Sequence, residues 1–202
     1  MRKKSHENEN FLDFGRIQQK MQTREKLLLA ANQMMIEGAA INITAVAKRA
    51  DVSKATAYRY FSSKEVLQRE AALHTKSEDK ENLFAGISND DLEQRLDKLI
   101  QYHYEILTQN EAEFRLFLSA VLKDSVQNKA NYSRAGRRIL LIEEALKPLK
   151  QTVSEEEFGR MVGAISTILG IESITVLKDL SHLGNEKILD VWTWMIKKIV
   201  QV

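Results

Sequence analysis

Hydrophobic residues recur along most of this chain at the spacing of an amphipathic α-helix. The clearest stripe is Leu92, Leu96, Leu99, His103 and Ile106, where steps of four and three residues place the side chains on one helical face. One Pro and eight Gly in 202 residues leave few of the turn signals that separate β-strands. The pattern therefore predicts an all-α protein.

Two segments near the C-terminal end are hydrophobic on nearly every side. Ser154 and Glu157 have the spacing of a capping box and open the first segment, which we expect to continue as one helix through residues 158–177. The second is expected over residues 185–200. Arg160 and Glu172 argue against a membrane span, so each helix is buried either in its own core or against a partner.

A body of this length is expected to leave part of both helices uncovered. We therefore predict a homodimer whose interface is a four-helix bundle with two helices from each chain. Small residues on the first of these helices allow close approach between helices, and large apolar residues on the second supply area. The predicted interface residues are Gly159, Val162, Gly163, Ile165, Trp192, Met195 and Ile196.

Residues 42–64 predict two short helices joined by a tight turn, a helix-turn-helix. Asn42 suits the N-cap of the first helix, because its side-chain oxygen can accept from an amide of the opening turn. Asp51 is one of the few residue types other than Gly that tolerate a left-handed turn. Ser53 is expected to cap the second helix, with Ala57 and Phe61 facing inward four residues apart.

The second helix then presents basic, small and aromatic side chains on its outer surface. Lys54, Ala55 and Thr56 occupy its N-terminal end, where a recognition helix meets base edges in the major groove. Tyr58 and Tyr60 carry hydroxyl groups on rigid rings, which suit phosphate oxygens. This surface favours DNA as the partner, whereas an isolated helix pair is common in domains that bind no DNA.

A further phosphate contact is predicted where the next helix begins. Ser62 and Glu65 have capping-box spacing, so we expect that helix to open at Ser62. Lys64 then adds its charge to the positive end of the helix dipole. Together they are expected to stabilise a bound phosphate.

Charge is distributed unevenly along the chain. Residues 1–64 contain 12 Lys and Arg against 6 Asp and Glu, a net charge of +6. The remaining residues contain 18 against 22, a net charge of −4, which gives the total of +2. Basic charge is thus concentrated in the same part of the chain as the predicted helix-turn-helix, as expected if phosphate binding occurs only there.

These residues resemble the tetracycline-repressor (TetR) family of transcriptional regulators. The N-terminal motif T-R-x-x-[IL]-L-x-A-A corresponds to residues 23–31, and I-A-x-x-A-G-V-S to residues 46–53. The motif K-x-T-x-Y-x-x-F-x-S-K-E-x-L corresponds to residues 54–67. Asp51 departs from the pattern, because the family usually has Gly there, and the link after Gly38 is about one residue short.

The resemblance implies a role for each matching position. Lys54, Ala55 and Thr56 are expected near bases, and Thr44 is expected to reach the groove from the first helix of the motif. Phosphate contacts are implied for Tyr58, Tyr60 and Lys64, and Ser53 belongs to the same surface. For Arg59 the family pattern leaves base, phosphate and solvent open.

The resemblance also implies an organisation of the whole chain. Residues 1–22 form an N-terminal extension, 23–68 the DNA-binding domain, and 69–202 a helical domain for ligand binding and dimerisation. The extension is either a basic arm for the minor groove or a solvated terminus. A small molecule in the C-terminal domain is expected to separate the two DNA-binding heads. Candidate pocket residues, each with ordinary packing as the alternative, are Tyr102, His103, Phe114, Phe117 and Arg137.

Other classes of function find little support. The four His residues are scattered, and no phosphate-binding loop, nucleophile motif or metal motif is present, so we expect no enzyme activity, no cofactor and no metal. Zero Cys and a polar N-terminal start fit a cytoplasmic protein. The expected function is a repressor that binds an inverted-repeat operator as a homodimer. The alternative is an architectural or cell-division DNA-binding protein without a ligand switch.

Overall fold

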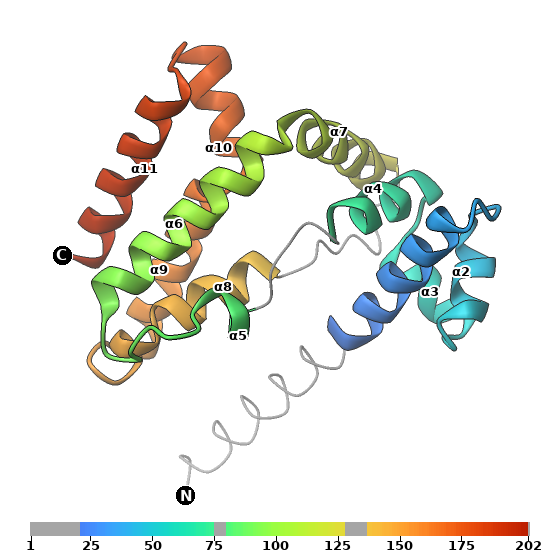
Figure 1. Cartoon of the computed structure of the whole chain (residues 1–202), viewed down its shortest axis with the longest axis horizontal. Helices are drawn as coiled ribbons and strands as arrows, with labels where there is room; N and C mark the ends of the chain where they lie inside the picture. The colour runs from blue at the N-terminus through green and yellow to red at the C-terminus, as the bar shows by residue number, and fades with distance from the viewer. Residues whose placement is uncertain (1–20, 75–79, 128–136, 202) are drawn as a thin grey trace, which may run out of the picture. The chain divides into compact units, whose positions relative to one another are not determined.

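The computed structural model describes residues 21–74, 80–127 and 137–201, and within them the fold is all-α, as predicted (Figure 1). Residues 1–20 of the predicted N-terminal extension lie outside this description. A first helix covers residues 21–36. The α-helices that follow are α2 (Ile43–Arg49), α3 (Lys54–Tyr60), α4 (Lys64–His74), α5 (Lys80–Leu83), α6 (Leu92–Gln109), α7 (Glu111–Gln127), α8 (Arg137–Ala145), α9 (Glu155–Ile168), α10 (Ile171–Thr175) and α11 (Asn185–Val200). Lys147–Gln151 forms a 3-10 helix and Val176–Leu180 a π-helix.

The chain divides into two compact units, and the division differs from the predicted domains. Unit 1 contains Met1–Thr75 and also Ser119–Ala135, whereas unit 2 contains Lys76–Leu118 and Gly136–Val202. The C-terminal half of α7 therefore belongs to the unit that carries the helix-turn-helix. A boundary placed only near residue 68 misses this, because the added segment lies far away in the sequence.

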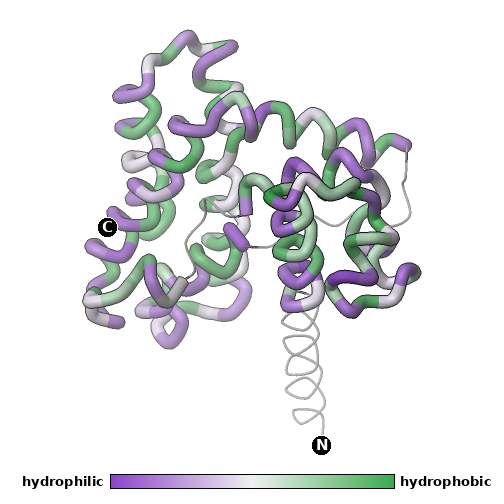
Figure 2. The backbone as a smooth tube through the Cα atoms, turned by 45° about the vertical axis from the view of Figure 1, so that its right-hand side comes forward, coloured by the Kyte–Doolittle hydropathy of each residue, from purple (hydrophilic) through white to green (hydrophobic). Residues whose placement is uncertain are grey.

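Unit 1 is built from amphipathic helices that bury one face each. The first helix buries Leu27, Leu28 and Ala31 at helical spacing, and α4 contributes Leu67 and Ala71 to the same core. Hydrophobic and hydrophilic residues alternate along these helices in Figure 2, as a half-buried helix requires. This core supports the short helices α2 and α3, because a helix of only two turns is not stable on its own.

Unit 2 has a core of four packed helices. Both α8 and α11 pack against α6 and α9. Leu96, Leu99, Ile142 and Ile165 have no accessible surface. Trp192 is equally buried, and its indole N–H donates to the Ser173 hydroxyl at 2.9 Å, so its one polar atom is satisfied.

The prediction of one long helix through residues 158–177 is wrong, because α9 ends at Ile168. Gly170 adopts an extended conformation, and any Cβ there would collide with the Arg138 guanidinium and the Glu172 carboxylate. The Arg138 guanidinium donates to the Ser166 carbonyl at 2.6 Å, near the end of α9. The space that Gly170 leaves is thus filled by an arginine from α8.

Among the described residues, no single helix has the length and hydropathy needed to cross a membrane. Glu155–Ile168 and Ile171–Leu180 reach those values only when taken together, and a bend of 48° separates them.

The predicted dimer-interface set is wrong for four of its seven residues. Ile165, Trp192 and Ile196 have 0% of their surface exposed and Val162 has 7%, since they fill the core of unit 2. A partner could not contact side chains that the chain itself already covers. Of the remaining three, Gly159 and Gly163 lie on the exposed face of α9, and Met195 is half-buried on α11.

Candidate nucleic-acid interface

The turn between α2 and α3 is built from local hydrogen bonds. The Asn42 side chain accepts from the Ala45 amide at 2.8 Å and caps α2, as predicted. After α2, Asp51 takes the left-handed conformation with φ of 53°, also as predicted. The Val52 amide then donates to the Ala47 carbonyl at 2.9 Å. This bond ties the turn back onto α2, so the chain reverses within a few residues.

The inner face of α3 fixes which of its residues face outward. Ser53 caps the helix by accepting from the Thr56 amide at 3.1 Å. Ala57 is fully buried and Phe61 is 1% exposed, so both pack against the core as the four-residue spacing predicted. Because one side of this two-turn helix is covered, the other side must carry its polar residues.

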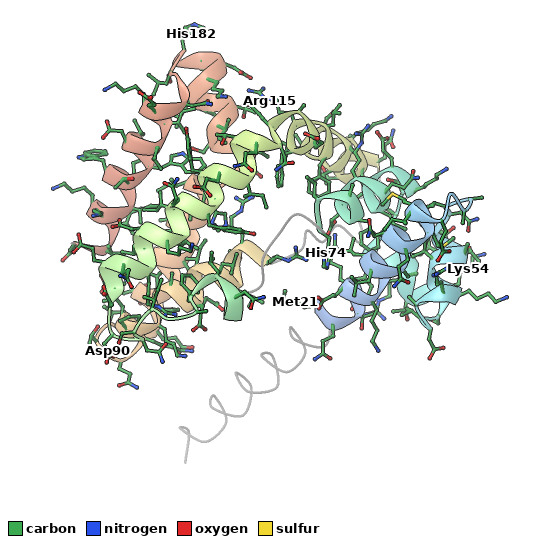
Figure 3. All side chains as sticks on the ribbon, in the orientation of Figure 1. Met21, Lys54, His74, Asp90, Arg115 and His182 are labelled. Atoms are coloured by element: carbon green, nitrogen blue, oxygen red, sulfur yellow. The ribbon has the colours of Figure 1, made fainter. Side chains whose placement is uncertain are left out.

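The outer face carries the side chains that the sequence singled out for DNA. Lys54, Ala55, Tyr58 and Arg59 are exposed, while Thr56 and Tyr60 are half-buried and Thr44 is exposed in the first turn of α2. Lys54 points away from the unit into solvent in Figure 3. Its ammonium group lies 6.0 Å from the centre of the Tyr58 ring, a weak attraction that brings the two side chains together.

A second group of contacts begins at α4. The Ser63 hydroxyl, rather than that of Ser62, accepts from the Val66 amide at 3.2 Å, so the helix begins at Lys64 and the predicted cap was one residue early. The Ser62 hydroxyl instead hydrogen-bonds the buried carboxylate of Asp124 on α7. Lys64 is exposed in the first turn, where its charge adds to the helix dipole as predicted.

Ion pairing separates the basic residues of this unit into two kinds. Arg49 is bound to Glu37 by hydrogen bonds of 2.5 and 2.7 Å, so its charge is compensated. Within the described part of the chain, Lys54, Arg59 and Lys64 have no carboxylate partner. Their uncompensated charges lie on α3 and at the start of α4. Such charges are available to phosphate groups.

The predicted pocket residues lie on three different helices of unit 2. The Tyr102 and His103 rings on α6 meet edge to face with centres 5.2 Å apart. Phe114 and Phe117 are half-buried on α7, and Arg137 is half-buried at the start of α8. Their role in ligand binding stays a prediction.

His103 is a neutral, packed histidine. Its Nδ1–H donates to the Leu99 carbonyl at 2.9 Å, and burial lowers the pKa of the imidazole to about 4, with the positive charge of Arg138 acting in the same direction. Arg138 was missed by the sequence reasoning, which chose its neighbour Arg137. The two adjacent arginines look alike in sequence, and only the packing of α8 decides which charge acts on the histidine.

Arg24 and Glu70 were also missed. They form a buried ion pair between the first helix and α4. A signal was present, because Arg24 occupies the same helical stripe as Leu27, Leu28 and Ala31. A charged residue on an apolar stripe indicates a buried partner.

The short turn, the capped α3 and its cationic outer face form a helix-turn-helix of the kind found in DNA-binding transcription regulators. Residues 27–71 match the family model described as bacterial regulatory proteins, tetR family. The matched region contains much of the first helix, α2, α3 and most of α4, and the predicted TetR-family resemblance is confirmed there. No curated protein and no solved structure matches the chain.

Proposed function

We propose that this protein is a homodimeric repressor that binds an inverted-repeat operator in the cytoplasm and is released by a small-molecule effector. The observation that carries the proposal is the outer face of α3, where Lys54, Ala55 and Thr56 form the N-terminal end and Tyr58 and Arg59 follow. The first three suit base edges and the tyrosine hydroxyl suits a phosphate. Repression requires only that such a surface occupies a promoter.

A dimer is proposed because one α3 reads only one major groove. Two copies related by twofold symmetry place their recognition helices about one helical turn, roughly 34 Å, apart, and their operator is then an inverted repeat. Gly159 and Gly163 support this, since a Cβ added at either position meets nothing within 4 Å. Trp194 on the neighbouring α11 is 64% exposed. Exposed small residues on one helix and an exposed tryptophan on the helix packed against it suit the approach of helices from a second copy.

The effector is proposed to bind in unit 2. The neutral His103 imidazole uses Nδ1 in the bond to Leu99, and no described residue hydrogen-bonds its Nε2. In this tautomer Nε2 is an acceptor, so it suits a ligand hydroxyl or N–H group. Tyr102 and Phe114, both half-buried, supply apolar surface of the kind that lines ligand sites.

The experiment that tests the proposal is selection of bound sequences from random duplex DNA, repeated with and without added cell extract. The expected result is enrichment of an inverted repeat. When the extract contains the effector, the protein should release this DNA, and it should no longer be recovered. An enriched single half-site would contradict the dimer.

An architectural or cell-division DNA-binding protein is the second candidate. The filled apolar core of unit 2 favours it, because such a body needs no ligand to fold. This candidate predicts the same selection result in both arms, with no component of the extract that releases DNA.

A further inference from the structure

Arg24 places a positive charge inside the core of the DNA-binding unit. It is 6% exposed, and its Nε and Nη2 atoms lie 2.7 and 2.6 Å from the two carboxylate oxygens of Glu70. Glu70 is also 6% exposed. Parallel bonds of this kind fix both the distance and the orientation of the two groups. Because an unpaired buried charge is strongly destabilising, each residue requires the other.

The third guanidinium nitrogen of Arg24 reaches the C-terminal end of α3. Its Nη1 donates to the carbonyl of Tyr60 at 3.3 Å. Tyr60 is the last residue of α3, and carbonyl groups at a helix end lack partners within the helix. The guanidinium carbon also lies 4.5 Å from the centre of the Phe61 ring. One side chain thus contacts both the carbonyl and the ring at which α3 ends.

The position of the C-terminal end of α3 determines the direction of its N-terminal end. Lys54 and Tyr60 are six residues apart, about 9 Å along a helix axis. A rotation of roughly 10° about Tyr60 therefore moves Lys54 by about 1.5 Å, enough to disrupt a hydrogen bond to a base edge. A two-turn helix has no stability of its own to resist such a rotation.

We propose that Arg24, with Glu70 as its counter-charge, is a positioning residue for sequence recognition, which orients α3 through the Tyr60 carbonyl and the Phe61 ring. The inference rests on the proposed sequence-specific DNA binding. Arg24 itself contacts no phosphate, because its charge is buried and neutralised by Glu70. Its loss therefore reduces discrimination between base sequences and leaves the salt dependence of binding unchanged.

The test uses the full-length protein with two variants. In Arg24→Met/Glu70→Leu both charges are replaced by apolar side chains of similar size, a change that often preserves or raises stability. In Arg24→Lys the charge opposite Glu70 is kept, but the planar guanidinium that contacts both the Glu70 carboxylate and the Tyr60 carbonyl is lost. The matched control is Arg49→Gln/Glu37→Gln, which removes an equivalent two-bond pair from the surface of the same unit.

The measured quantity is the ratio of affinities for the selected operator and for a scrambled duplex, over a range of salt concentrations, with folding checked by circular dichroism. The apolar double variant is expected to stay folded and to lose about tenfold in this ratio, the discrimination that one base contact supplies. Its affinity for the scrambled duplex and its salt slope should match those of the control.

An unchanged ratio in the folded double variant would overturn the positioning role, and a salt slope reduced by about one would make Arg24 a phosphate contact instead. If the double variant unfolds, Arg24→Lys decides by the same criteria. Absence of discrimination in the unaltered protein would reject the proposed function itself.

Discussion

Gly163→Leu is expected to stabilise the single chain and to dissociate the proposed dimer. Gly163 lies inside α9, is exposed, and has open space where a Cβ would stand. Glycine in a helix interior costs about 0.5–1 kcal/mol relative to alanine, so a helix-forming residue there raises the stability of the monomer by roughly that amount. For a chain of this size, 1 kcal/mol corresponds to about 2–4 °C in the melting temperature.

The effect on the proposed dimer has the opposite sign. Extra methylene groups in a packed contact cost about 1–3 kcal/mol. In a twofold interface this cost applies twice, because each copy contributes one substituted residue. The dissociation constant should therefore rise at least about 30-fold.

Sedimentation measures the dissociation constant of the dimer. Thermal unfolding at several protein concentrations measures how much dimerisation adds to the stability of the fold. The melting temperature of the unaltered protein should rise with concentration, whereas that of Gly163→Leu should not. Gly163→Ala is the control, because it gives the same gain in helix propensity with little bulk. A Gly163→Leu protein that sediments as a dimer with an unchanged dissociation constant would place the interface elsewhere.

Three further predictions concern single positions. Lys64→Ala should weaken binding to all DNA sequences and reduce the salt slope by about one, whereas Lys54→Ala should relax discrimination at particular bases; equal effects of both in a salt titration would refute the division of roles. Asp51→Val should destabilise the fold by roughly 1–2 kcal/mol, because a β-branched residue resists the left-handed φ of 53°, and an unchanged chemical denaturation midpoint would contradict this. Burial lowers the pKa of His103 from an ordinary 6.5 to about 4, so its imidazole should stay neutral in the folded protein at pH 5. The unfolded chain then binds a proton at a higher pH than the folded chain does, and stability falls as the pH drops from about 6.5 to about 4. An NMR titration in which the imidazole of the folded protein titrates near pH 6.5 would refute this.

The sequence alone was sufficient for features held by bonds between near neighbours. Asn42 and Ser53 cap helices through amides three residues away, and Asp51 makes the turn through its own backbone preference. The spacing of Ala57 and Phe61 likewise determined which face of α3 is buried. In each case the cause lies within about one helical turn, so the pattern of residues contains it.

Features that depend on distant segments required the tertiary structure. The partner of Arg24 is 46 residues away, and the carboxylate that hydrogen-bonds Ser62 is 62 residues away. The break at Gly170 depends on Arg138 from another helix, and the burial of Trp192 depends on how four helices pack. Periodicity shows that a helix has an apolar face, but only packing decides whether the chain itself or a partner covers that face. The recognition helix was therefore read from the sequence, whereas the groups that hold its end in place were found only in the folded protein.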